Sequence, residues 1–243
     1  MMLDRTVIVT GSNRGIGLEI VRQLDSEGYR IAACCRKASN ELTTLIETSP
    51  YQHKIFKFDL SEEREIKDVT VDMLKWTGIP YGLVNCAGLA TGGLFSMTRI
   101  QELREIFEIN LFGPLFLTQL VSKKMLRAKQ GAIVNIASTA GILADTGTMA
   151  YGGTKASLIH ATRVLASELG AFGIRVNAIA PSLVDTGMAS LMDEAAKDKL
   201  ENRSALKAKT QASNVADAVS FLLSSKSEMI SGQILRIDRG MPF

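Results

Sequence analysis

The sequence lacks the features typical of secreted, membrane or nucleic-acid-binding proteins. Only three of its 243 residues are cysteines, and their spacing fits neither a metal site nor a disulfide framework. The 28 Lys and Arg residues nearly balance the 25 Asp and Glu residues, so no extended basic field indicates nucleic acid. No apolar run is long enough to span a bilayer, and the first residues lack a secretory pattern. We therefore expect a cytoplasmic protein with no metal, no nucleic-acid partner and no membrane partner.

The chain also has no Pro- or Ser-rich linker, no internal repeat and no low-complexity segment. Instead, short β-branched runs alternate with longer helical patterns along its whole length. This alternation predicts one doubly wound Rossmann-type α/β domain, with a mostly parallel seven-stranded sheet flanked by helices on both faces. The expected strands are 5–10, 30–35, 54–58, 82–85, 133–138, 174–180 and 233–237. The expected helices run from the first glycine loop to about 27, then over 61–76, 99–128, 149–171, 185–206 and 212–223.

A glycine-rich loop follows the first expected strand and leads directly into a helix. Its residues are Gly11, Ser12, Asn13, Arg14, Gly15, Ile16 and Gly17. Glycines let the backbone approach a pyrophosphate closely, and the helix N-terminus supplies N–H groups and a positive dipole end. A glycine-rich turn without a ligand is the alternative. The order of strand, glycine turn and helix favours a dinucleotide-binding loop.

The end of the second expected strand bears on the choice of cofactor. In NAD-binding folds an acidic residue near this point holds the ribose 2′-hydroxyl. Here the strand ends in Cys35-Arg36-Lys37, with no carboxylate. Arg36 suits a 2′-phosphate, and Arg14 in the glycine loop is placed to reach the same group. The alternative is that Arg36 is an ordinary charge at a strand end. We expect NADP(H) as the cofactor.

Tyr151 and Lys155 are four residues apart, which places both on one face of a helix. The ordinary pKa of tyrosine is about 10. A neighbouring ammonium favours the phenolate and would lower that pKa, making the pair suited to proton transfer. Ser138, at the end of an apolar run, is placed to hold a substrate oxygen. The alternative is that Tyr151 and Lys155 are an ordinary i,i+4 pair on a helix surface, with no catalytic role.

The expected sheet decides between these alternatives, because ligands of parallel sheets bind at the carboxyl ends of the strands. The glycine loop lies at such an end. So do further candidates: Arg36, Asp59, Asn85, Ser138 and Pro181. One fold-level inference therefore gathers the candidates into one cleft with Tyr151 and Lys155.

With these residues assembled, the chain resembles the short-chain dehydrogenase/reductase family over nearly its full length. Four segments carry the resemblance. They are the cofactor loop Thr10-Gly11-x-x-x-Gly15-Ile16-Gly17, the strand end Asn85-Cys86-Ala87-Gly88, the tetrad Asn110, Ser138, Tyr151 and Lys155, and the loop from Pro181 to Thr186.

The resemblance implies a division of labour among these residues. Tyr151 would transfer the proton, and Lys155 would lower the pKa of that tyrosine and bind the nicotinamide ribose. Ser138 would orient the substrate oxygen, and Asn110 would hold a water in the proton relay. Further cofactor contacts are implied for Asp59, Leu60, Asn85, Ala87, Gly88, Pro181, Val184 and Thr186.

Within the family, the chain resembles the 3-oxoacyl-(acyl-carrier-protein) reductases of fatty acid biosynthesis. That implies reduction of a 3-oxoacyl thioester to a 3-hydroxyacyl product, with acyl carrier protein as a possible partner. Ser182 and Arg239 stand where that subgroup usually has glycine, and Phe172 occupies one of its two carrier-facing basic positions. Recognition of a carrier protein is therefore the least supported part of this expectation.

Two other functions stay open at this point. One is a reductase or dehydrogenase of a sugar, a steroid or a secondary metabolite, since the substrate loops at 88–94, 140–149 and 182–200 do not reveal their ligand. The other is a non-catalytic protein that senses NADP(H). The resemblance also implies a homo-oligomer, a tetramer or a dimer, paired through the expected helices at 99–128 and 149–171.

Overall fold

The sheet of the protein is parallel throughout the residues that the structure, a computed structural model, describes: 5–187 and 194–242. Seven strands lie in the order β3-β2-β1-β4-β5-β6-β7. Their bounds are β1 Thr6–Thr10, β2 Arg30–Cys35, β3 Lys54–Lys57, β4 Gly82–Asn85, β5 Gly131–Ile136, β6 Ile174–Pro181 and β7 Ile234–Ile237. The predicted doubly wound α/β fold is confirmed.

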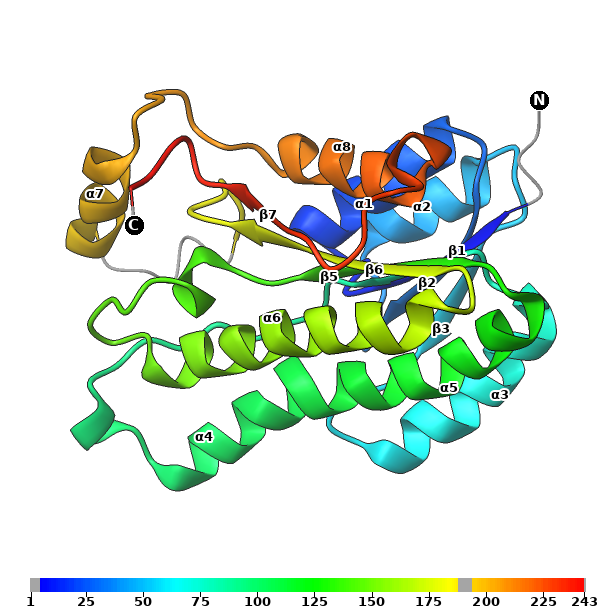
Figure 1. The fold of residues 1–243 in the computed structure, drawn as a ribbon, viewed down its shortest axis with the longest axis horizontal. Helices are drawn as coiled ribbons and strands as arrows, with labels where there is room; N and C mark the ends of the chain where they lie inside the picture. The colour runs from blue at the N-terminus through cyan, green and yellow to red at the C-terminus, as the bar shows by residue number, and fades with distance from the viewer. Residues whose placement is uncertain (1–4, 188–193, 243) are drawn as a thin grey trace.

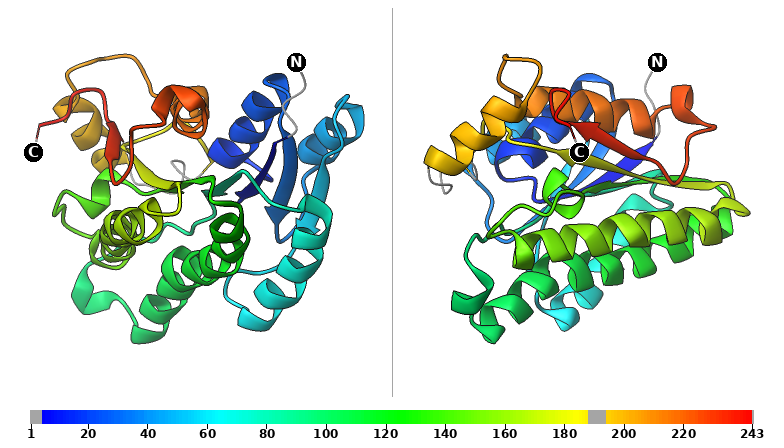
Figure 2. Two further views of the ribbon diagram at one scale, coloured as in Figure 1. Left: turned by 45° about the vertical axis from the view of Figure 1, so that its right-hand side comes forward. Right: turned by 60° about the vertical axis from the view of Figure 1, so that its left-hand side comes forward.

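Helices cover both faces of this sheet (Figure 1; Figure 2). One face carries α1 (Gly15–Ser26), α2 (Asn40–Thr48) and α8 (Ala212–Leu223). The other carries α3 (Glu63–Thr77), α5 (Gly113–Ala128) and α6 (Met149–Gly170), with α4 (Ile100–Phe107) leading into α5. The remaining helix, α7 (Glu194–Arg203), lies beyond the sheet at the carboxyl ends of the strands.

Two layers of apolar side chains explain why β1 is β-branched at every position. Val7 and Val9 of β1 pack with α1 and α8, whereas Ile8 between them packs with α3 and α5 on the opposite face. All three side chains are fully buried. A strand buried on both faces needs apolar residues at every position, which is typical of parallel sheets.

The helices differ from the expectation at residues 40–48, within 99–128 and over 185–206. Helix α2 was not anticipated; its N-cap Ser39 accepts a hydrogen bond from the Leu42 N–H at 3.1 Å. The helix expected over 99–128 is interrupted by a π-helical turn at Glu108–Phe112.

The helix expected over 185–206 is wrong at both ends. Asp185 lies in a bend, where its N–H donates to the Thr210 carbonyl at 2.9 Å, and α7 ends at Arg203. Residues 188–193 of that expected helix lie outside the described residues.

Candidate active site

The glycine loop between β1 and α1 adopts a conformation that only small residues tolerate. Gly11 and Gly15 have φ angles of +70° and +55°, in the left-handed region that favours glycine. A Cβ at Gly17 would lie 2.1 Å from the Gly11 carbonyl oxygen, so the start of α1 closes tightly over the loop. The result is a backbone cradle at a helix N-terminus, which fits a pyrophosphate.

Thr10 joins this loop to the end of β4, the neighbouring strand. Its hydroxyl accepts hydrogen bonds from the N–H groups of Cys86 and Ala87 at 3.0 and 3.1 Å. A Cβ at Gly11 would lie only 2.8 Å from the Ala87 Cα. The glycine loop after β1 and the chain after β4 are therefore held in fixed positions relative to each other.

Two serine hydroxyls form hydrogen bonds that stabilise the glycine loop. The Ser12 hydroxyl is buried and donates to the Val9 carbonyl at 2.7 Å, so this candidate side chain supports the turn. Ser39 donates to the Asn13 carbonyl, also at 2.7 Å. Sequence reasoning missed Ser39 because it missed α2. The signal was a serine N-cap followed by Glu41 in the first helical turn.

Arg36 and Arg14 lie on the exposed rim of the crevice. The Arg36 side chain is 70% exposed, and its guanidinium lies 3.4 Å from a carboxylate oxygen of Asp59. Partial burial acts to raise the pKa of Asp59, but hydrogen bonds from Ser61 and the charge of Arg36 together lower it. Asp59 is therefore ionised at neutral pH and partly neutralises Arg36.

The side chain of Asn85 is buried in the interior of the fold, below the cleft. Its amide donates to the Thr118 hydroxyl at 2.9 Å and to the Asn135 side-chain oxygen at 2.8 Å, and the side chain is only 3% exposed. The Asn135 amide continues the chain of bonds to the Thr162 hydroxyl at 2.9 Å. The Asn85 side chain thus ties β4 and β5 to α5 inside the fold, in place of lining the crevice.

Lys155 is buried beneath the strand ends. Its ammonium donates to the Ile136 carbonyl at 2.8 Å, and the residue is 4% exposed. Burial lowers the pKa of Lys155 from its ordinary value of 10.5 to about 8. A Cβ at Gly88 would lie 3.5 Å from this ammonium and 3.4 Å from Oδ1 of Asn110, so the chain after β4 passes in van der Waals contact with both groups.

Tyr151 lies beside Lys155, and its ring centroid is 5.7 Å from the ammonium nitrogen. Burial raises the pKa of Tyr151, and a hydrogen bond with the Ser138 hydroxyl opposes that rise without cancelling it. The expected net lowering of the Tyr151 pKa is therefore wrong, because burial outweighs the effects that oppose it.

Asn110 occupies the π-helical turn between α4 and α5 and is fully buried. Its side-chain oxygen accepts from the Leu89 N–H at 2.7 Å, and its amide donates to the Leu89 carbonyl at 2.8 Å and to the Thr154 hydroxyl at 3.2 Å. The hydrogen-bonding groups of the Asn110 side chain are thus already paired with the loop after β4 and with α6. A water in a proton relay, as the resemblance implied, would need other groups of this turn.

Glycines hold Ser138 against Tyr151. Ser138 precedes a short 3₁₀ turn over Thr139–Gly141 that packs directly on α6. A Cβ at Gly152 would lie 2.5 Å from the Ala140 carbonyl oxygen, and one at Gly141 would lie 2.7 Å from the Ala156 nitrogen. The turn and the helix therefore approach as closely as backbones allow.

We expect Gly152→Ala to separate the turn from α6, since the added methyl meets backbone. It should destabilise the protein by about 1–3 kcal/mol and reduce turnover. Gly153→Ala is the matched control, because its methyl would meet only the Phe107 ring edge at 3.5 Å. That variant should keep turnover and gain up to about 1 kcal/mol from helix propensity. Urea unfolding and steady-state turnover check both, and equal behaviour of the two variants would contradict the packing argument.

The loop after β6 closes the far side of the crevice. The Ser138 hydroxyl lies 3.5 Å from the Pro181 carbonyl oxygen. The methyl of Thr186 would lie 3.5 Å from a Cβ at Gly15. Val184, which lies between Pro181 and Thr186 in the sequence, is buried. The loop thus spans from Ser138 to the glycine cradle. On the opposite side Leu60 is fixed by α5, because a Cβ at Gly113 would lie 2.1 Å from its carbonyl oxygen.

Ion pairs connect helix α7 with Asp145, in the segment before α6. Asp145, in the segment that follows Ser138, accepts two hydrogen bonds from one nitrogen of Arg203, at 2.9 and 3.1 Å. The Lys199 ammonium lies 3.3 Å from the same carboxylate. These bonds connect α7 with the segment that leads into α6.

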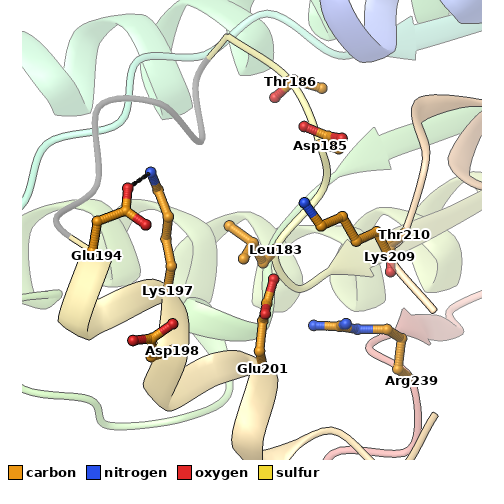
Figure 3. A pocket seen from close by; sticks show the side chains of 10 residues that line it. All are labelled: Leu183, Asp185, Thr186, Glu194, Lys197, Asp198, Glu201, Lys209, Thr210 and Arg239. Carbon is orange, nitrogen blue, oxygen red and sulfur yellow. Dashed lines mark hydrogen bonds and ion pairs between the residues drawn. The ribbon is translucent and has the colours of Figure 1, made fainter. Parts of the chain in front are cut away.

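Two cavities flank the site. One, of about 320 Å³, lies between α7, the loop after β6 and the chain after β7 (Figure 3). Its walls are Leu183, Asp185, Thr186, Glu194, Lys197, Asp198, Glu201, Lys209, Thr210 and Arg239. The other, of about 270 Å³, is apolar and lies between residues 140–144 and α6. Its α6 residues, such as Met149, Gly153 and Ala156, lie on a different helix face from Tyr151 and Lys155.

No helix in the described part of the chain combines the length and apolar character needed to cross a membrane. Within residues 5–187 and 194–242, no group of three or more His, Cys, Asp or Glu side chains is placed to hold a metal ion.

Comparison with known proteins places these features in context. A family model described as enoyl-(acyl carrier protein) reductase matches residues 11–242. The chain is 30% identical to 3-oxoacyl-[acyl-carrier-protein] reductase FabG of Staphylococcus epidermidis, over 98% of this chain and 99% of the relative. It is 34% identical to L-xylulose reductase of Caenorhabditis elegans, over 98% of this chain and 95% of the relative.

Solved structures agree in fold. A short-chain type dehydrogenase/reductase from Mycobacterium ulcerans superposes with a TM-score of 0.90 at 25% identity, covering 99% of this chain and 90% of the other. A structure of ElxO with NADP bound gives a TM-score of 0.89 at 25% identity, covering 98% and 99%.

Proposed function

Since the chain belongs to the short-chain dehydrogenase/reductase family, an oxidoreductase family that acts on carbonyl and hydroxyl groups, we propose that it reduces a ketone with NADPH. One observation carries the proposal. Ser138, Tyr151 and Lys155 converge at the carboxyl ends of the strands, on the same edge of the sheet as a glycine cradle that fits a dinucleotide. A protein that only senses NADP(H) has no need of the three side chains together.

The side chains divide the proton chemistry between them. A bound nicotinamide supplies the hydride. Tyr151 is protonated at neutral pH because burial raises its pKa, so it is ready to donate a proton to the ketone oxygen. Ser138 shares a hydrogen bond with that phenol and orients the same oxygen. Lys155, charged below a pH of about 8, stabilises the phenolate that remains.

The preference for NADPH rests on the rim of the crevice. A 2′-phosphate carries up to two negative charges, and Arg36 and Arg14 are exposed and able to bind it. Asp59 competes for Arg36, but its 3.4 Å contact is long and open to solvent, so a phosphate displaces it easily. The bound NADP in the similar ElxO structure adds support.

We expect Arg36→Asp to narrow or invert the preference for NADPH over NADH, because the substitution puts a second carboxylate beside Asp59. The matched control is Arg64→Asp, the same change at a 94% exposed arginine on α3, which should leave the preference intact. The measurement is kcat/KM for both cofactors with one ketone. Equal or better efficiency of the unaltered protein with NADH would refute the assignment.

Two substrate classes have support. The relatedness to FabG favours a 3-oxoacyl thioester, with a carrier protein as a possible donor of the acyl group. The relatedness to L-xylulose reductase and the charged cavity favour a polyhydroxylated ketone. Comparing kcat/KM for a ketose and for an acetoacetyl thioester separates the two classes.

A further inference from the structure

We propose that the substrate is a polyhydroxylated ketone, whose distal hydroxyls bind in the charged cavity, and that Arg239 is a specificity-determining residue for it. This inference rests on the proposed reductase function.

The wall of the cavity is hydrophilic. Seven of its ten residues are charged, two are threonines, and Leu183 is the one apolar member among the described residues. An acyl chain placed here would remove charged groups from water without giving them partners, which is costly. The volume of about 320 Å³ lies at the small end of ligand pockets and suits a short metabolite.

The charges of this wall are largely available to a ligand. Lys197 is paired with Glu194 at 2.6 Å. Across the described residues, no ion pair involves Asp185, Asp198, Glu201, Lys209 or Arg239. Figure 3 shows the carboxylate of Glu201 and the guanidinium of Arg239 both directed into the cavity. Acceptors and donors facing one space suit hydroxyl groups, which donate to carboxylates and accept from cations.

Arg239 stands on a backbone that favours glycine. Its φ is +61°, in the left-handed region, so a side chain here is kept against a conformational cost. The guanidinium donates to the Ala208 carbonyl at 3.2 Å, while its buried Nε has no partner among the described residues. An arginine that is kept on this backbone and directs its guanidinium into the cavity is best explained by a ligand that the guanidinium binds.

The cavity lies next to the catalytic groups without containing them. Thr186 in its wall adjoins Gly15 of the cofactor loop, and Leu183 follows Pro181, whose carbonyl faces Ser138. Neither Ser138 nor Tyr151 lines it. The cavity is therefore placed to receive the end of the substrate away from the reacting carbonyl.

The test compares Arg239→Gly with Lys129→Gly. Lys129 is the other non-glycine residue of the described chain with positive φ, at +53°, and it caps α5 away from the cavity. Both variants relieve strain, so neither should lower the thermal midpoint. KM and kcat are measured with NADPH and three probes: L-xylulose, diacetyl and acetoacetyl-N-acetylcysteamine.

We expect the parent to prefer L-xylulose. Arg239→Gly should raise the KM for L-xylulose by about 10-fold or more, the usual result of losing a hydrogen bond from a charged group, and leave diacetyl within about threefold. Lys129→Gly should change neither. Glu201→Gln should raise the KM for L-xylulose in the same selective way.

An unchanged KM for L-xylulose in Arg239→Gly, an equal rise for diacetyl, or a parent that prefers the acetoacetyl thioester would overturn the inference and leave the reductase function standing. A folded parent that reduces none of the three probes would instead count against the proposed function itself.

Discussion

Tyr151→Phe is expected to bind NADPH with near-normal affinity and to lose most of its turnover. Positioned proton transfer contributes about 10²–10⁴-fold to the rate, and phenylalanine removes only the donating hydroxyl. The ring fills the same buried space beside Lys155, so the fold should be retained. The measurement is kcat with a small ketone together with the dissociation constant for NADPH from fluorescence titration.

The control is Tyr51→Phe, the same chemical change at a tyrosine whose ring lies 6.2 Å from the His53 ring, far along the chain from the site. It should leave turnover and NADPH affinity unaltered. If Tyr151→Phe keeps turnover within a factor of a few of the parent, another group supplies the proton.

Lys155→Met is expected to combine a loss of turnover with a gain in stability. Turnover should fall by at least about 10²-fold because the phenolate loses its stabilising charge. The free energy of unfolding at neutral pH should rise by about 1–3 kcal/mol, since burying the ammonium costs roughly 1.4 kcal/mol per unit of pKa shift and the lost bond to Ile136 offsets part of the gain. Opposite changes in activity and stability are typical of strained functional groups.

The sign of the pH dependence follows from linkage. The pKa of Lys155 is about 8 in the folded protein and 10.5 without perturbation, so the unfolded chain binds the extra proton between these values. The burial penalty is fully present below a pH of about 8 and disappears as the pH rises towards 10.5. The stability advantage of Lys155→Met should therefore shrink across that window.

Chemical unfolding at several pH values checks this expectation. Lys75→Met, at a 73% exposed lysine of α3, is the matched control and should show no such advantage at neutral pH. A Lys155→Met protein that is less stable than the parent at neutral pH would show that the ammonium stabilises the fold.

The arrangement of the sheet was predictable because its causes are local. Short β-branched runs, such as Ile8 with its valine neighbours, alternate with helical periods, and parallel sheets bring their strand ends to one edge. The same logic placed Ser138 with Tyr151 and Lys155. The four-residue spacing of Tyr151 and Lys155 then placed these two side chains next to each other on α6.

Burial and bonding partners could not be predicted in this way. The i,i+4 spacing says nothing of the Ile136 carbonyl that holds Lys155, nor of the burial that raises the pKa of Tyr151. Asn85 at a strand end was equally consistent with the cleft and with the core. Its register opposite Asn135 of β5, set by tertiary packing, places its side chain in the core.

The π-helical turn shows a second limit. An isolated sequence over 99–128 reads as a single helix with a kink at Pro114. The break instead lies around Asn110, because its side chain satisfies both backbone groups of Leu89, a residue of a different loop. Only the folded chain brings these two segments together.

The central claim is that this chain is an NADPH-dependent ketone reductase whose proton donor is Tyr151. It is tested most directly by following NADPH oxidation on addition of a ketone, side by side for the parent and Tyr151→Phe at saturating cofactor. The account predicts ketone-dependent oxidation by the parent, slower with NADH, and almost none by the variant despite equal NADPH binding. A folded parent that binds NADPH but does not oxidise it with any of the ketone probes would contradict the account.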